Sequence, residues 1–222
     1  MPQLDIIITF LFAIGLGQGC WLTLMAFKRG VPSSLILRAL WSFTGVWVLF
    51  WPVYKNTTSI FVAMILFAII ILLVSTIRHP ASHLIKLAWS DGMSWPWPMM
   101  MFLTALAIAA AFSTQFPEFG FGAALSICLG LPLAHWLDRS GRLKLQFPSN
   151  PAQTLPGHLG LIATVIITCG WSLHVFHQIG WFESLTATAL AGIAASTARA
   201  LIPHPFNLPA IAAAIGGVLW VL

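Results

Sequence analysis

Residues 60–77 read IFVAMILFAIIILLVSTI, eighteen consecutive positions without a charged side chain. A lipid bilayer has a hydrocarbon core about 30 Å thick, which an α-helix crosses with about 20 mainly apolar residues. The strands of a membrane β-barrel alternate apolar and polar side chains, and this block does not. The block therefore predicts a transmembrane helix.

The rest of the chain has the same character as this block. Of its 222 residues, 59% are hydrophobic and 7% are charged, and the mean hydropathy is +0.93. Soluble domains carry about one charged residue in four. With about 27 residues for each span and its turn, the chain has room for roughly eight spans. Composition thus excludes a water-soluble enzyme and predicts an all-helical bundle, with residues 1–222 forming a single integral membrane domain.

Eight apolar segments, separated by Gly, Pro and polar residues, are the expected spans. They are residues 6–27, 37–53, 59–77, 96–113, 119–137, 157–177, 182–201 and 207–222.

The basic residues support this arrangement, because nine of the ten flank odd-numbered connections and only Lys55 lies on the other side. The nine are Lys28, Arg29, Arg38, Arg78, Lys86, Arg139, Arg142, Lys144 and Arg199. The positive-inside rule then places the odd-numbered loops in the cytoplasm and both termini on the opposite side. We therefore expect a multi-pass protein of a bacterial inner membrane or an organellar membrane, with the lipid bilayer and not nucleic acid as its partner.

The fifth connection is the richest in polar side chains, and residues 138–158 read DRSGRLKLQFPSNPAQTLPGH. Arginine and lysine beside amide side chains are suited to binding phosphate groups at a membrane surface. The candidate residues are Arg139, Arg142, Lys144, Asn150, Gln153 and Thr154. The alternative is that these cations only orient the chain and contact anionic lipid headgroups.

Two histidines, His174 and His177, are spaced to face one side of a helix and could bind a metal or a tetrapyrrole. No carboxylate or thiolate lies near them in the sequence, and Trp171 and Trp181 flank them. An aromatic belt at the membrane surface is therefore the favoured interpretation. We expect no metal site.

Small residues inside the apolar blocks favour packing roles. Cys20, Cys128 and Cys169 stand alone, without the spacing of a disulfide framework or a zinc site. The run Gly15–Gly19, GLGQG, lies within an expected span, where small residues allow helices to pack closely.

Carboxylates are scarce, which matters because phosphoryl transfer normally needs them to hold Mg²⁺. The chain has five, and in the expected topology only Asp91 and Asp138 face the cytoplasm. A two-metal site is difficult to build from these residues.

The segment 128–162, CLGLPLAHWLDRSGRLKLQFPSNPAQTLPGHLGLI, resembles the core of the CTP-dependent polyprenol kinases. This family includes phytol, farnesol and dolichol kinases and is related to phosphatidate cytidylyltransferases. The matching positions are Gly130, Ala134, Arg139, Gly141, Lys144, Asn150, Pro151, Thr154 and Gly157. Residues 38–54, RALWSFTGVWVLFWPVY, and 198–213, ARALIPHPFNLPAIAA, are similar to flanking family motifs, so the resemblance covers most of the chain from Arg38 onward.

The departures from the family pattern fall on its functional residues. Leu131 and His135 stand where the family has aspartates, and Arg199 where it has a glutamate. The other departures are Gln153 for a lysine, His158 for a serine, Phe206 before Asn207, Ala39 after the early arginine, and Ser42 for a histidine. Without these carboxylates the chain lacks the ligands that would hold Mg²⁺ beside a nucleotide.

The resemblance therefore implies a noncatalytic family member that keeps a lipid groove, formed by Gly130, Ala134, His135 and Asn207, with Gly157 beside the phosphate-binding cations. Its ligand would be an isoprenoid lipid or a phytylated or carotenoid pigment, and it would act as an accessory subunit beside partner membrane proteins.

Two other functions stay open at this point. The rival is an active CTP-dependent phytol or polyprenol kinase with a rearranged site, in which Asp138 and Asp91 hold Mg²⁺ and the loop cations hold CTP. A small transporter is a third possibility, although the chain lacks the charges in span centres that mark a transport path.

Overall fold

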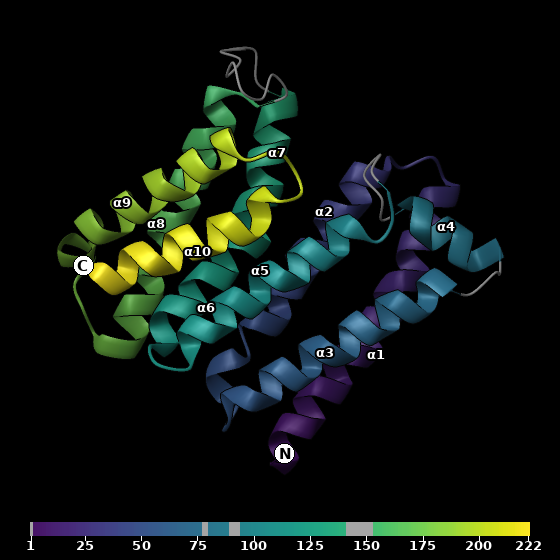
Figure 1. The fold of residues 1–222 in the computed structure, drawn as a ribbon, viewed down its shortest axis with the longest axis horizontal. Coiled ribbons are helices and arrows are strands. Elements are labelled where there is room, and N and C mark those ends of the chain that lie inside the picture. The colour runs from purple at the N-terminus through teal and green to yellow at the C-terminus, as the bar shows by residue number, and fades with distance from the viewer. Residues whose placement is uncertain (1, 77–79, 89–93, 141–152) are drawn as a thin grey trace. The chain divides into compact units, whose positions relative to one another are not determined.

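The computed structural model describes residues 2–76, 80–88, 94–140 and 153–222, and the described residues form helices and connecting turns with no strand among them (Figure 1). The chain divides into two compact units, Met1–Leu103 and Thr104–Leu222, with the boundary inside one helix. The predicted all-helical class is confirmed.

The first unit contains the long apolar block that predicts a transmembrane helix. Residues 60–76 of this block lie in a helix whose bounds are Thr57–Thr76. The helical segments are α1 (Gln3–Lys28), α2 (Ser33–Val48), a 3₁₀ turn (Trp51–Val53), α3 (Thr57–Thr76), α4 (Pro80–Ala88) and α5 (Trp97–Ser113). The short helix α4 lies in the connection between the expected spans 59–77 and 96–113.

Aromatic side chains form the core of the first unit. Phe12 stacks on Trp47 with ring centroids 5.0 Å apart, and Phe67 meets Phe12 edge-on at 5.2 Å. Trp41 stacks on Phe102 at 4.9 Å. Such ring pairs add roughly 0.5–1.5 kcal/mol each beyond the area they bury. These contacts hold α1, α2, α3 and the start of α5 together.

The second unit is built around α8. Its segments are α6 (Pro117–Leu125), a π-helical stretch η2 (Ser126–Gly130), α7 (Leu131–Ser140), α8 (Leu155–His177), α9 (Trp181–Leu201) and α10 (Asn207–Val221). The helices α6, α7 and α9 all pack against α8, and α10 packs against α9 and α6 (Figure 1).

Glycines allow helices to pack closely in the second unit. A Cβ at Gly122 would lie 3.0 Å from the Cα of Cys169, and one at Gly192 would lie 3.2 Å from the Cα of Ile162. The Ser126 and Thr168 hydroxyls bond across the same α8 contact at 2.6 Å. Close approach through small residues is typical of helices that pack within membranes.

The predicted packing role of the run Gly15–Gly19 is supported at one position only. A Cβ at Gly15 would meet the Phe43 ring at 3.2 Å, whereas a Cβ at Gly17 or Gly19 would have nothing within 4 Å. The last two glycines therefore leave space beside α1.

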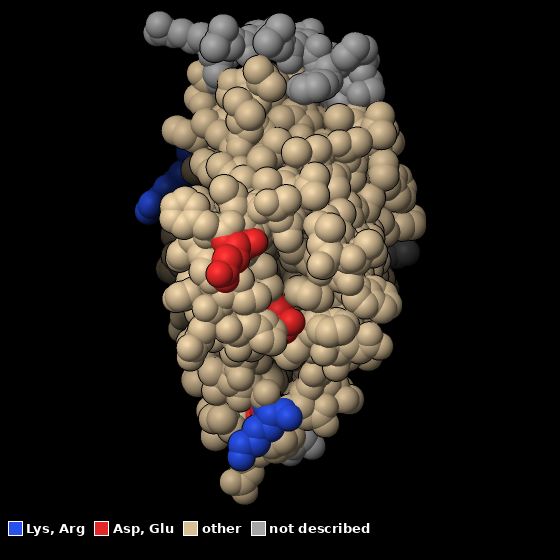
Figure 2. All heavy atoms as spheres, turned by 90° about the vertical axis from the view of Figure 1, so that its left-hand side faces the viewer, with Lys and Arg blue, Asp and Glu red and all other residues tan. Residues whose placement is uncertain are grey.

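Four helices in the described part of the chain are long and apolar enough to cross a membrane. They are Gln3–Lys28, Ser33–Val53, Pro117–Ser140 and Leu155–His177. Only 6% of the most apolar stretch of α1 is buried, so most of its side chains are at least partly exposed. Figure 2 shows a face of the molecule on which uncharged residues predominate. Many large apolar side chains on these helices are exposed, which is unfavourable in water, so these features indicate a membrane protein. Eight spans and their orientation stay predictions.

Candidate functional site

Asp138, the carboxylate that a rearranged kinase site would need, lies near the C-terminal end of α7 and is fully engaged by its neighbours. Its Oδ1 accepts hydrogen bonds from the Thr154 backbone N–H at 2.8 Å and the Thr154 hydroxyl at 2.9 Å. Its Oδ2 pairs with Nη2 of Arg199. The side chains of Arg199 and Asp138 are 7% and 6% exposed, so this is a buried ion pair.

The polar contacts continue from Arg199 to His158. Gln153 Nε2 donates to the Arg199 backbone carbonyl at 3.0 Å, and Gln153 Oε1 lies 3.0 Å from Nε2 of His158. Because an amide oxygen only accepts, His158 Nε2 carries the proton, and Nδ1 accepts from the Ser196 hydroxyl at 2.7 Å. We call Asp138, Gln153, Thr154, His158, Ser196 and Arg199 the buried polar network.

Local sequence explains why α7 and α8 meet here. Thr154 is the N-cap of α8, its hydroxyl accepting from the Gly157 N–H at 3.4 Å, and a proline follows in the first turn. A Cβ at Gly157 would overlap the Asp138 carboxylate and lie 2.9 Å from the Ala134 carbonyl oxygen. Glycine at this position therefore lets the start of α8 reach Asp138.

Three residues at which the sequence departs from the pattern that it resembles lie together in this network. Gln153, His158 and Arg199 hydrogen-bond to one another or to Asp138. The buried positive charge of Arg199 pairs with the carboxylate of Asp138. The sequence analysis counted Arg199 among the basic residues that flank odd-numbered connections, and the structure shows that its side chain is buried.

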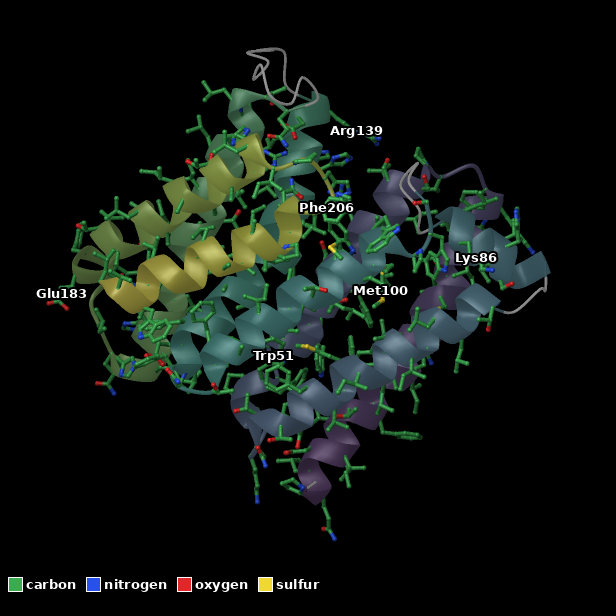
Figure 3. The ribbon with its side chains drawn as sticks, in the orientation of Figure 1. Trp51, Lys86, Met100, Arg139, Glu183 and Phe206 are labelled. Atoms are coloured by element: carbon green, nitrogen blue, oxygen red, sulfur yellow. The ribbon has the colours of Figure 1, made fainter. Side chains whose placement is uncertain are left out.

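The other predicted site residues are distributed as follows. Gly130 and Ala134 lie in packed contacts, where a Cβ at Gly130 would meet Leu161 and Thr164, and Ala134 is fully buried. Asn207 is buried at the start of α10, and Arg139 is exposed near the end of α7 (Figure 3).

His135 is half-buried on α7. The lipid groove expected at Gly130, Ala134, His135 and Asn207 stays a prediction. Asp91, Arg142, Lys144 and Asn150 lie outside the described residues.

The two candidate histidines have neighbours within the protein. His177 Nε2 lies 2.8 Å from Oε1 of Glu118, a buried carboxylate in the first turn of α6, and His174 Nδ1 lies 3.1 Å from the Ile179 carbonyl oxygen. Sequence reasoning missed the Glu118 contact because 59 positions separate the two residues. Among the described residues, His, Cys, Asp and Glu form no group of three or more that could hold a metal ion.

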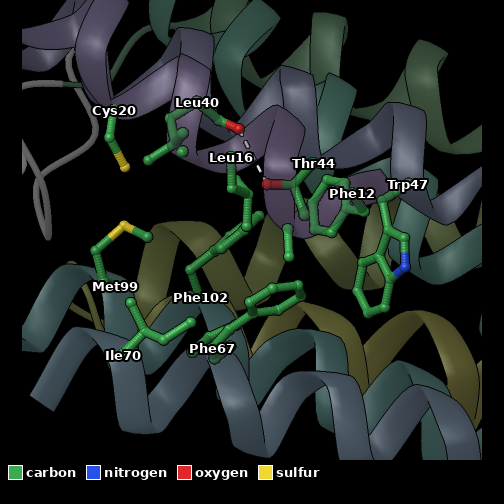
Figure 4. Close-up of a pocket in the computed structure, with 13 residues that line it drawn as sticks. Phe12, Leu16, Cys20, Leu40, Thr44, Trp47, Phe67, Ile70, Met99 and Phe102 are labelled. Carbon is green, nitrogen blue, oxygen red and sulfur yellow. Dashed lines mark hydrogen bonds between the residues drawn. The ribbon is translucent and has the colours of Figure 1, made fainter. Parts of the chain in front are cut away.

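The first unit contains an apolar cavity of about 200 Å³ (Figure 4). Four aromatic rings, those of Phe12, Trp47, Phe67 and Phe102, form part of its wall. The other lining residues are Ala13, Leu16, Gly17, Cys20, Leu40, Thr44, Ile70, Met99 and Leu103. This lining suits a hydrocarbon ligand, and no sequence motif had marked it because its residues come from four separate helices.

Comparisons with known proteins name no relative: no family model, no curated protein and no solved structure matches this chain.

Proposed function

We propose that this protein is a noncatalytic, polyprenol-kinase-like membrane protein that binds an isoprenoid lipid or a phytylated or carotenoid pigment. It would serve as an accessory subunit of a larger membrane complex. The observation that carries the noncatalytic part is the buried ion pair between Asp138 and Arg199, together with the two hydrogen bonds from Thr154.

The energetics of that pair oppose a role in metal binding. A Mg²⁺ ion that recruited Asp138 would have to displace Arg199, leaving a buried guanidinium without its counter-charge. Removing one partner of a buried ion pair costs about 3–5 kcal/mol.

Two features support the binding of an apolar ligand. The cavity in the first unit has mostly apolar walls and is lined by α1, α2, α3 and α5. The outward-facing apolar surface of α1 is available to lipids and to partner membrane proteins.

A phosphotransfer assay tests the noncatalytic part. Purified protein in lipid nanodiscs is given CTP, Mg²⁺ and phytol, farnesol or dolichol, with an active phytol kinase as the positive control. We expect no phosphorylated product above the protein-free background. Turnover that disappears in Asp138→Asn would instead establish the active kinase and overturn the proposal.

Mass spectrometry of protein purified in mild detergent tests the binding part. We expect a stoichiometric isoprenoid or pigment, with or without a partner membrane protein. A lone chain with no apolar ligand, which also fails to take up added phytol, would contradict it.

A further inference from the structure

We infer that the apolar cavity of the first unit holds the hydrocarbon end of an isoprenoid chain, its last isoprene units, and not the oxygenated head of the ligand. This inference rests on the proposed function and specifies which part of the ligand is bound and where. It follows from the volume of the cavity, the hydrogen bonds that its polar atoms already form and the aromatic side chains in its walls.

The volume limits the occupant to a small group. An apolar cavity of about 150 Å³ stays dry and accepts a benzene ring. In proportion, about 200 Å³ has room for roughly eight carbon atoms, enough for a terminal isoprene unit and part of the next one. The remainder of a long chain would extend from the cavity toward the lipid.

Two polar groups along the wall already form hydrogen bonds within the protein. The Thr44 hydroxyl donates to the Leu40 carbonyl oxygen at 3.0 Å, as Figure 4 shows, and the Trp47 indole N–H donates to the Tyr54 hydroxyl at 2.9 Å. A quinone or other carbonyl head would find no strong donor among the lining side chains. Leaving such a buried acceptor unpaired costs about 1–3 kcal/mol, so the cavity selects against it.

An isoprenoid end fits better than the end of a saturated acyl chain. Isoprenoids carry a double bond in each five-carbon unit or a methyl branch that restricts rotation, so fewer torsions are frozen on binding. The wall also offers four aromatic rings to these unsaturated or branched units. Cys20 and Met99 lie at the opposite end of the cavity from Trp47 (Figure 4).

Gly17 offers a means of filling the cavity without disturbing the helix. It lines the cavity, and a Cβ at this position would meet nothing within 4 Å. Gly19 lies on the same helix with equally open surroundings but does not line the cavity. Gly17→Leu and Gly19→Leu therefore form a matched pair.

The test uses photoreactive probes with the full-length protein in nanodiscs, and peptide mass spectrometry locates the label. One farnesol analogue carries a diazirine in its terminal isoprene unit, and a second carries it beside the hydroxyl. A phosphatidylcholine with a diazirine at the end of an acyl chain reports on ordinary lipid. We expect the first probe alone to label the cavity wall, at Cys20, Met99 or Phe102.

Labelling by the first probe should fall about tenfold in Gly17→Leu and stay unchanged in Gly19→Leu. Equal labelling of the wall by the hydroxyl-end probe or the phospholipid would overturn the inference, as would an unchanged Gly17→Leu. If Gly17→Leu does not fold, the wild-type protein alone tests the inference. Labelling of the cavity wall by the first probe supports it, and labelling only at other positions overturns it. Saturable labelling elsewhere refutes this inference alone, whereas no saturable labelling anywhere also refutes the proposed binding function.

Discussion

The contact between Asp138 and Arg199 gives the sharpest prediction for single side chains. Asp138→Asn and Arg199→Leu each leave a buried charge without its partner, so each should lower the free energy of unfolding by about 3–5 kcal/mol. The double variant should lose less than the sum, because it leaves neither charge buried alone. Denaturant titration of protein in detergent micelles measures all three values.

Arg139→Leu is the matched control for these three variants. It removes an exposed arginine that is next to Asp138 in the sequence. Its effect should stay within about 1 kcal/mol, because interactions of an exposed charged side chain contribute little to stability. Additive losses in the double variant would show that the two side chains act independently, contrary to our account.

Gly157 gives a second prediction at this scale. Gly157→Ala places a methyl group against the Asp138 carboxylate and the Ala134 carbonyl, so the start of α8 must shift. We expect a loss of about 1–3 kcal/mol, the usual cost of overpacking. Thermal unfolding followed by circular dichroism measures it.

Gly160→Ala, one turn along α8, is the comparison for Gly157→Ala. Its methyl group would meet first the end of the Leu137 side chain, which can rotate away. If Gly160→Ala loses as much stability as Gly157→Ala, the cost comes from placing alanine anywhere in this part of α8. The close approach of Gly157 to Asp138 would then not be its cause.

Sequence reasoning identified several residues of the buried polar network but not their relation. Asp138, Gln153 and Thr154 were recognised as polar candidates, and Arg199 was recognised as a departure from the family pattern. Nothing in the sequence shows that Arg199 lies beside Asp138, because 61 positions separate them and the packing of both α7 and α9 against α8 brings them together.

Among the helices, α3 depends on a contact from α1. Asp5 is fully buried, and its carboxylate accepts hydrogen bonds from the Lys55 N–H at 3.0 Å and the Ser59 hydroxyl at 2.7 Å. Asp5→Ala leaves both donors unsatisfied at a cost of about 1–3 kcal/mol. Hydrogen exchange should then accelerate at residues 55–60 more than in α8.

Asp5→Asn keeps one acceptor oxygen in the same place and should show a smaller increase than Asp5→Ala. Equal exchange in the wild-type protein and Asp5→Ala would mean that the carboxylate does not hold the start of α3.

The long apolar segments could be predicted as helices because composition alone determines them. The expected span 157–177 corresponds to α8, Leu155–His177, and the span 182–201 to α9, Trp181–Leu201. The helix α4 was missed because nine residues beginning at a proline give too short a pattern. The cavity was also beyond prediction, since its walls depend on how four helices pack.

For the whole molecule, the orientation in the membrane is the open question. The distribution of basic residues predicts that the turn after α5 is non-cytoplasmic and that the end of α7 is cytoplasmic. Thr114 and Ser140 are exposed at these two places. In sealed cells, Thr114→Cys should react with a membrane-impermeant maleimide, and Ser140→Cys should react only after permeabilisation.

The wild-type protein serves as the background control for this labelling. Its cysteines lie within apolar helices, and Cys128 and Cys169 are fully buried. If Ser140→Cys reacts in sealed cells and Thr114→Cys reacts only after permeabilisation, the orientation is opposite to the one predicted. Reaction of both variants in sealed cells would show that the segment Pro117–Ser140 does not cross the bilayer, although its length and composition allow it.

Asp138 pairs with Arg199 and accepts hydrogen bonds from Thr154, so we expect that it does not hold a metal beside a nucleotide. Calorimetric titration of the wild-type protein in nanodiscs with CTP in the presence of Mg²⁺ measures this. We expect no saturable heat up to millimolar CTP, the same as for Asp138→Asn. Saturable binding that requires Mg²⁺ and vanishes in Asp138→Asn would contradict it.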